Sequence, residues 1–520
     1  MGGSLKQILL CLFFISIFYG AFAQSGPGAA QGGPGTENFP PINPDPRALD
    51  FFNRGAALRL QGRDFSWTDL AEISLWASGD AAVSMEGGEA GFSRLGQILT
   101  AAETIRSLPN LPSGQRERAE FVLAYMHSNI LRTYSLYQTR VDTIFENGRY
   151  NCVYSAVLYM VLCMSLGIEA SGVMTRDHAF VIVHIGGENI DVETTNALGF
   201  DPGNRREFHD QFGRATGFAY VPAQNYRDRQ TISPIELISL IFQNRISEHE
   251  RGRRFAEAIP LAVNRLALLS GEALAAPGSD VSAAGFFENP REYLLDRLLN
   301  YGASLLNSNR EEESLRWAVY AAAQYPDESR WQELILAAVN NRMTRFIRAN
   351  QLTEARAFLE NQKPLLGGAN FARLDSSLLD TELISRINRI NNALEGDAIV
   401  NSVREAQREG RLTERRASEI LVFAARRTAS VLAAAPGRDW LAAIGYIENI
   451  IARFGPSREL EQDLQNYQRN RAADFHNRFA AEWNRRNYDE AERILNEGLA
   501  EFPNDRQLLI NRDTLNRNRP

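Results

Sequence analysis

The stretch GRYNCVYSAVLYMVLCMSLG, residues 148–167, decides the fold of this chain. Asn151 is a favourable N-cap residue, and Gly167 tolerates the left-handed conformation that often follows the last turn of a helix. The residues between them are apolar nearly all round, which is typical of a helix buried in a core. A membrane span needs about 20 such residues, so this run is too short to be one. We therefore predict a buried helix from Cys152 to about Leu166.

Three extended segments follow this helix. Residues 168–175 form the first, and the run HAFVIVHI at 178–185 is rich in β-branched and aromatic side chains, as strands are. Gly186-Gly187 predicts a tight turn that returns the chain as a third strand over residues 189–195. The expected fold class is therefore α+β, with the helix packed on an antiparallel sheet.

Cysteine, histidine and acidic residues occur here in an order that suits a thiol nucleophile. Cys152 lies at the expected helix start, where free N–H groups and the helix dipole favour a thiolate. His178 opens the second strand and can act as the base and ion-pair partner of the sulfur. Asp191 and Glu193 on the returning strand are the candidates for the acceptor that orients the imidazole. We predict a catalytic site made of these residues.

This order resembles the transglutaminase-like superfamily, which typically has a Gly-x-Cys or similar turn before the nucleophile helix. In that family the helix ends in Leu-Gly-Ile, and His-Ala-Trp and Val-Asp-Pro-Thr follow. The chain has GRYNC at 148–152, SLGI at 165–168, DHAF at 177–180 and IDVETT at 190–195. The resemblance covers about residues 110–225. It implies a papain-like Cys-His-Asp core with Cys152 as nucleophile and His178 as base and acid; Phe180 replaces the usual Trp.

The third member of the triad stays open between two residues. Asp191 preserves the residue type of the family, whereas Val192-Glu193-Thr194-Thr195 overlays Val-Asp-Pro-Thr better by position. Strand alternation puts Asp191 and Glu193 on one face. A two-residue turn at Gly186-Gly187 would place Thr195 opposite His178, with Glu193 as the diagonal neighbour. Geometry favours Glu193 and residue type favours Asp191.

Backbone N–H groups near Cys152 are expected to bind an oxyanion, with Asn151 or Gln138 as further donors. We expect Cys163 to be an inert core residue, because it lies deep in the apolar helix. His127 is expected to be structural, and His184 to have no direct role. No Cys and His residues have zinc-ligand spacing, and no glycine-rich stretch matches a phosphate loop, so neither metal nor cofactor is expected.

The first residues resemble a secretory signal. Lys6 supplies the positive charge, residues 8–19 form the apolar run, and Ala21-Phe-Ala23 is a cleavage motif. We expect export and cleavage after Ala23. Two cysteines follow this cleavage site, Cys152 and Cys163. On one helix they would be about 16 Å apart, which is too far for a disulfide.

Composition sets the broad class. The 520 residues are enough for two or three domains, and an apolar content of 44% is typical of a globular chain. A formal charge of −7 gives no electrostatic reason to expect nucleic acid as a partner. Because the cleaved signal is the only membrane-directed segment expected, we predict no stable membrane span in the mature chain.

The C-terminal half predicts paired helices that resemble tetratricopeptide repeats, with irregular spacing and insertions near 271–290 and 365–380. The recurring pattern is an aromatic residue or Leu, then a small residue, then an apolar one on the same face. It occurs at Phe255, Ala258 and Ala262; Leu352, Ala355 and Leu359; Trp440, Ala443 and Ile447; and Tyr488, Ala491 and Leu495. The expected division is a signal peptide at 1–23, a disordered Gly/Pro linker at 24–46, a helical segment at 47–110, a transglutaminase-like domain at 111–228 and helical repeats at 229–520.

These predictions combine into an exported thiol enzyme. It would transfer or hydrolyse an acyl group at an amide, and its helical repeats would recruit a protein or peptide. Fold-level analogy with exported peptidase-like members favours hydrolysis over crosslinking. One alternative is an exported scaffold without catalysis, in which the transglutaminase-like fold is vestigial and the repeats bind the partner. A second is a thiol enzyme acting on cell-wall peptides.

Overall fold

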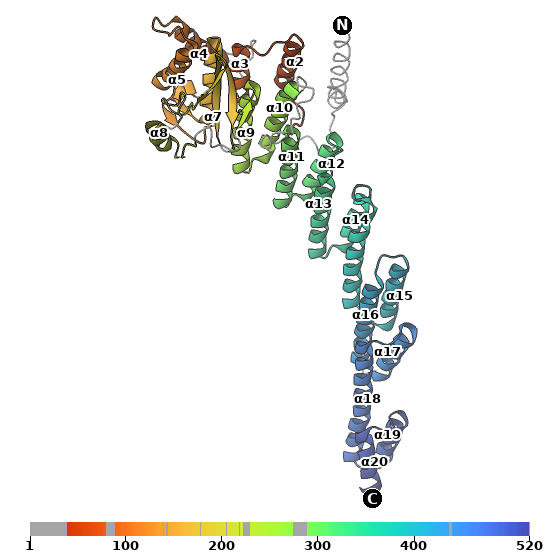
Figure 1. Ribbon diagram of the computed structural model, residues 1–520. Helices are drawn as coiled ribbons and strands as arrows, with labels where there is room; N and C mark the ends of the chain where they lie inside the picture. The colour runs from red at the N-terminus through yellow and green to blue at the C-terminus, as the bar shows by residue number, and fades with distance from the viewer. Residues whose placement is uncertain are drawn as a thin grey trace. The chain divides into compact units, whose positions relative to one another are not determined.

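The structure is a computed structural model, drawn in Figure 1. It describes residues 39–79, 89–138, 140–141, 144–176, 178–203, 205–217, 219–221, 229–273, 289–435 and 439–518. The expected signal peptide at 1–23 lies outside these residues, as does the linker up to residue 38. The fold is mostly helical with one small antiparallel sheet, and it divides into two compact units, Met1–Ala338 and Val339–Pro520.

Helix α7 (Cys152–Ser165) is the centre of the first unit. Asn151 caps it, its side chain accepting a hydrogen bond from the Tyr154 N–H, and Gly167 follows it with a φ of 71°. All its residues are buried except Cys152 and Met164, which are partly exposed. The helix is apolar on every side because it packs on strands β3 (Glu169–Met174) and β4 (Ala179–Ile185) and on helices α3 (Trp67–Ala77), α5 (Gln115–Asn129) and α9 (Pro234–Arg251).

The antiparallel sheet has the order β5-β4-β3-β6, with β5 at Glu188–Val192 and β6 at Gln230–Ile232. Ile185 pairs with Glu188 across Gly186-Gly187, whose φ values of 60° and 85° suit a type I′ turn, so the predicted two-residue turn is confirmed. The predicted third strand is shorter than expected. It ends at Val192, because the next residue, Glu193, donates its N–H to Gly199 and not to β4.

The sheet includes a strand from beyond residue 228, the domain boundary expected from the sequence. β6 pairs with β3, bringing Ile232 opposite Gly172. A Cβ at Gly172 would lie 2.8 Å from the Ile232 side chain, so glycine permits this close pairing. Helix α9 follows at once, its start fixed by a capping box of Ser233 and Glu236, and it covers α7.

The remaining elements of the first unit surround this core. These elements are α2 (Pro46–Leu60), α4 (Glu89–Ser107), β1 (Thr133–Tyr134), α6 (Ile144–Asn147), β2 (Arg149–Tyr150), α8 (Arg206–Thr216), α10 (Phe255–Ala273), α11 (Pro290–Asn307) and α12 (Glu311–Gln324). Asp45 caps helix α2 and anchors it to α10 through two hydrogen bonds with Asn264, of 3.0 and 2.6 Å. Helix α13 (Arg330–Arg348) contains the division between the two units.

The second unit consists of helices in the part of it that the structure describes. Successive helices from α15 to α20 pack on one another, and the predicted small residues, among them Ala355, Ala443 and Ala491, are buried. The expected insertion at 365–380 is instead largely helical, because the chain continues as a helix on both sides of a break at Gly367. The helices are α14 (Leu352–Asn388), α15 (Ala393–Arg408), α16 (Glu414–Ala434), α17 (Trp440–Phe454), α18 (Arg458–Asn484), α19 (Tyr488–Glu501) and α20 (Arg506–Asn518). None of the described helices is both long and apolar enough to cross a membrane.

Candidate active site

The thiol of Cys152 lies at the first residue of α7, at the positive end of the helix dipole. Asn151, 3% exposed, holds this end in place: its Oδ1 accepts from the Tyr154 N–H and its Nδ2 donates to the Gln138 carbonyl at 2.7 Å. Both ends of the Asn151 amide are therefore engaged in shaping the turn before Cys152.

Backbone donors face outward at the same helix end. Within the described part of the chain, the N–H groups of Cys152 and Val153 have no hydrogen-bond acceptor, whereas Tyr154 and Ser155 donate to Asn151. Gln138 donates its side-chain amide to the Arg140 carbonyl. The two backbone groups beside the sulfur are thus the donors best placed to bind an oxyanion.

His178 lies between Cys152 and Glu193. Its Nε2 is 2.7 Å from Glu193 Oε2, and the two side chains are only 13% and 2% exposed. The Cys152 side chain also lies close enough to the imidazole to raise its pKa. Because Nε2 is engaged by the carboxylate, Nδ1 is the ring nitrogen left for the sulfur. The structure therefore brings these three predicted residues together.

The protonation of His178 is set by its neighbours. Burial disfavours the charged imidazole and lowers its pKa, but the negative charges of Glu193 and Cys152 and the hydrogen bond to Glu193 outweigh burial. The pKa of His178 therefore lies well above its usual value. A protonated imidazole beside the sulfur is the ion-pair arrangement that stabilises a thiolate.

Glu193 is held by a tight loop that follows β5. Its Oε1 accepts hydrogen bonds from the N–H and the hydroxyl of Thr195, at 3.1 and 2.6 Å. Thr194 ties the same loop to α7 through a 2.8 Å hydrogen bond between its hydroxyl and that of Ser155. Gly199 closes the loop, and a Cβ there would lie 1.9 Å from the Glu193 carbonyl oxygen, so no other residue fits without moving Glu193.

Asp191, the other candidate acid, is directed elsewhere. Its two carboxylate oxygens pair with the two terminal nitrogens of Arg229, at 2.8 Å for one of them. Arg229 in turn lies over the ring of Phe180, 5.2 Å from its centroid. Asp191 thus forms a bidentate pair beside the sheet edge, and Glu193 is the carboxylate that meets His178.

Tyr134 is a site residue that sequence reasoning missed. Strand β1 pairs with β2 in parallel, which puts the ring of Tyr134 5.9 Å from that of Tyr150 and its side chain close enough to Cys152 for the two to interact electrostatically. Burial and the negative charges of Cys152 and Glu193 raise the pKa of Tyr134 well above its usual value. A two-residue strand carries no periodic signal, so nothing in the sequence pointed to this contact.

The other candidates lie away from the triad. Cys163 is fully buried, and burial raises the pKa of its thiol to about 12; it forms no disulfide with Cys152. His184 is hydrogen-bonded to Ser171 and Asn189 on the neighbouring strands.

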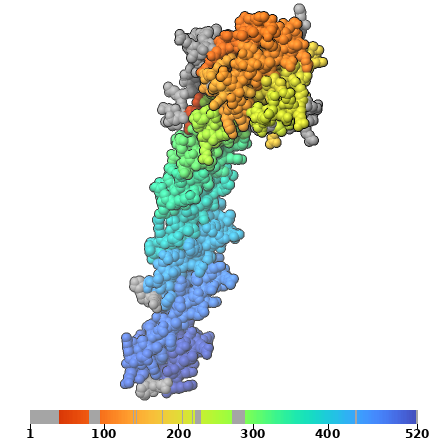
Figure 2. Space-filling model, turned by 90° about the vertical axis from the view of Figure 1, so that its left-hand side faces the viewer, coloured from red at the N-terminus to blue at the C-terminus, as the bar shows by residue number. Residues whose placement is uncertain are grey.

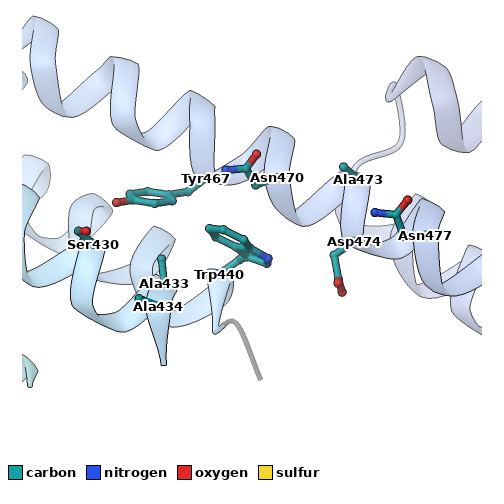
Figure 3. Close-up of a pocket in the computed structure, with 9 residues that line it drawn as sticks. All are labelled: Ser430, Ala433, Ala434, Trp440, Tyr467, Asn470, Ala473, Asp474 and Asn477. Carbon is teal, nitrogen blue, oxygen red and sulfur yellow. The ribbon is translucent and has the colours of Figure 1, made fainter. Parts of the chain in front are cut away.

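Two cavities bear on function. One of about 360 Å³ lies next to the triad, between Tyr150, Thr195 and α8. Figure 2 shows the first unit from a side on which yellow residues near 200 border orange ones near 100. The other, of about 640 Å³, lies among α16, α17 and α18 of the second unit (Figure 3). Trp440 and Tyr467 line it, with ring centroids 6.1 Å apart.

No protein-family model matches this chain, and neither does any curated protein sequence.

Proposed function

We propose that this protein is an exported thiol enzyme of the transglutaminase-like type that acts on an amide. The observation that supports this best is the arrangement of three side chains: the Cys152 thiol neighbours the His178 imidazole, and the imidazole is hydrogen-bonded to the almost fully buried Glu193 carboxylate. A thiol at a helix N-terminus, an imidazole beside it and an acceptor behind the imidazole are the three parts that nucleophilic catalysis by cysteine needs.

The proposed reaction has two steps. The Cys152 thiolate attacks the amide carbonyl, and the N–H groups of Cys152 and Val153 bind the oxyanion. The imidazolium of His178 then gives its proton to the leaving amine as the C–N bond breaks, which leaves a thioester on Cys152. Water, or an amine in the transfer reaction, attacks the thioester while His178 takes its proton, and the thiolate is released. Glu193 stabilises the imidazolium in each step.

The order of elements supports a papain-like core. A helix begins with the nucleophile and packs on antiparallel strands, the histidine precedes one strand, and the acid follows the next. Two departures from the transglutaminase-like pattern remain, Phe180 in place of Trp and a glutamate as the acid. A longer carboxylate side chain suits an acid that lies beyond the end of its strand, in the loop closed by Gly199.

We propose further that the tetratricopeptide-like helices recruit a protein or peptide partner. The cavity in Figure 3 supports this, because an aromatic pair, Trp440 and Tyr467, adjoins polar side chains on one face of α18. Asn470, Asp474 and Asn477 follow Tyr467 at helical spacing, so their amides and carboxylate can bind peptide groups while the rings bind apolar ones. The same cavity also suits the alternative function, a scaffold without catalysis.

An acyl-enzyme experiment tests the proposed chemistry. We expect a library of peptide p-nitroanilides, mixed with the protein at pH 7 and quenched in acid, to give a mass increase equal to the acyl group on the peptide that contains Cys152. Cys163→Ala should retain the adduct and Cys152→Ala should lose it. An adduct that persists in Cys152→Ala, or its absence from the wild-type protein with every library member, would contradict the proposal.

A further inference from the structure

The cavity beside the triad has polar walls. Its lining includes the ring of His127, the Tyr150 and Thr195 side chains, and the side chains of Asn196, Gln211 and Arg214. At about 360 Å³ it is within the size range of small-molecule pockets. Residues that line it are also attached to the catalytic ones: Tyr150 is two residues before Cys152, and Thr195 donates two hydrogen bonds to Glu193.

Arg214 brings an uncompensated positive charge to this cavity. The residue is exposed, and its Nε donates to the Asp210 carbonyl at 3.2 Å. Among the residues that the structure describes, no carboxylate forms an ion pair with it, whereas Arg206 on the same helix lies 3.9 Å from Asp210. The planar guanidinium therefore keeps its terminal N–H groups for a ligand, and their geometry matches a carboxylate.

The neighbouring groups do not cancel this charge. His127 donates from Nε2 to the Thr194 carbonyl at 3.1 Å, and burial lowers its pKa, so its ring is neutral at pH 7. Asn196 accepts from the Leu198 N–H with its Oδ1, which leaves its Nδ2 to donate. Asp210, one turn before Arg214 on α8, has its carboxylate 3.9 Å from Arg206. Glu193 is 2% exposed, and its charge is balanced by the imidazolium of His178.

We infer that this cavity binds a carboxylate of the substrate, close to the amide that Cys152 attacks. This rests on the proposed function, and it narrows the substrate class to peptides with an acidic side chain near the reacting bond. Tyr150 links the two places, since it lines the cavity and lies two residues before Cys152 in the chain.

Binding to the Cys152→Ala protein tests the inference without any chemistry. The probes are two peptides, labelled with a fluorophore at the N-terminus and amidated at the C-terminus, Ala-Ala-Glu-Ala-Ala and Ala-Ala-Gln-Ala-Ala, followed by polarisation at 50 mM salt. We expect the Glu peptide to bind at least about tenfold more tightly, because a charge-assisted hydrogen bond is lost with Gln. Arg214→Gln should reduce this preference to below about threefold, and Arg214→Lys should keep part of it.

Arg206→Gln is the matched control, since Arg206 is on the same helix, is 95% exposed and does not line the cavity; its preference should equal that of the parent protein. Equal binding of the two peptides, or a Glu preference that survives Arg214→Gln, would overturn the inference. The Glu preference could depend on Arg214 while the wild-type protein forms no acyl-enzyme. That result would support a carboxylate site and would refute its role in binding a substrate of Cys152. Acyl-enzyme formation without a Glu preference would leave the proposed function and refute the carboxylate site.

Discussion

Glu193→Gln is expected to lower the rate of acyl-enzyme formation by roughly 10³- to 10⁴-fold. The amide has nearly the same shape but no charge, so it cannot stabilise the imidazolium of His178, whose raised pKa depends on the carboxylate 2.7 Å away. In the wild-type protein the Nε2–H of His178 donates to the carboxylate. The amide NH₂ of glutamine can instead donate to Nε2, which favours the tautomer with its proton on Nδ1. The rate constant for acylation of Cys152, measured by quenched mass analysis, reports this loss.

Asp191→Asn is the matched control for that change. It removes a carboxylate two residues away and weakens a bidentate pair with Arg229, without touching the imidazole. We expect its acylation rate to stay within about tenfold of the wild-type rate. Far-UV circular dichroism should be unchanged in both variants, which separates chemistry from misfolding. If Asp191→Asn lost as much activity as Glu193→Gln, the assignment of Glu193 as the orienting acid would be wrong.

Tyr159→Ala is expected to lower the free energy of unfolding of the first unit by about 3–5 kcal/mol. The side chain is fully buried at the middle of α7, and its hydroxyl donates to the Ala119 carbonyl of α5 at 3.0 Å. Alanine would leave a cavity beneath the helix that presents Cys152. Urea unfolding, followed by mass mapping of alkylated Cys163, measures the effect, because Cys163 is buried on the same helix and reacts when the unit opens.

Tyr159→Phe separates packing from hydrogen bonding at this position. It keeps the ring and removes only the hydroxyl that donates to the Ala119 carbonyl, so the expected loss is about 0.5–1.5 kcal/mol. Equal losses in the two variants would mean that the hydrogen bond, and not the packing of the ring, is what holds α7 on α5.

In the first unit, the elements that could be predicted from the sequence are those defined by residues close together in the chain. An N-cap, a long apolar run and a following glycine define α7, and two glycines set the register of β4 and β5. The acid was left open because its choice depends on contacts that are distant along the chain. Asp191 forms an ion pair with Arg229, which is 38 residues away in the chain. The loop that ends at Gly199 directs the Glu193 side chain toward His178.

Two further features depend on pairings that leave little trace in the sequence. Strand β6 is three residues long and joins the sheet from the far side of a loop, so its residues were assigned to the helical repeats. Tyr134 reaches Cys152 only because two short strands, β1 and β2, pair in parallel. The buried small residues of the C-terminal helices were predictable, since their spacing repeats the helical period.

The pH dependence of Cys152 alkylation tests the central claim most directly. If His178 is an imidazolium paired with the sulfur, the rate constant with iodoacetamide stays within about threefold between pH 6 and 8 in the wild-type protein. In His178→Ala it should rise about tenfold per pH unit over the same range, as for an ordinary thiol. Cys163, whose pKa burial raises to about 12, should not react in either folded protein. A wild-type rate that climbs tenfold per unit, with the same profile as His178→Ala, would contradict the account.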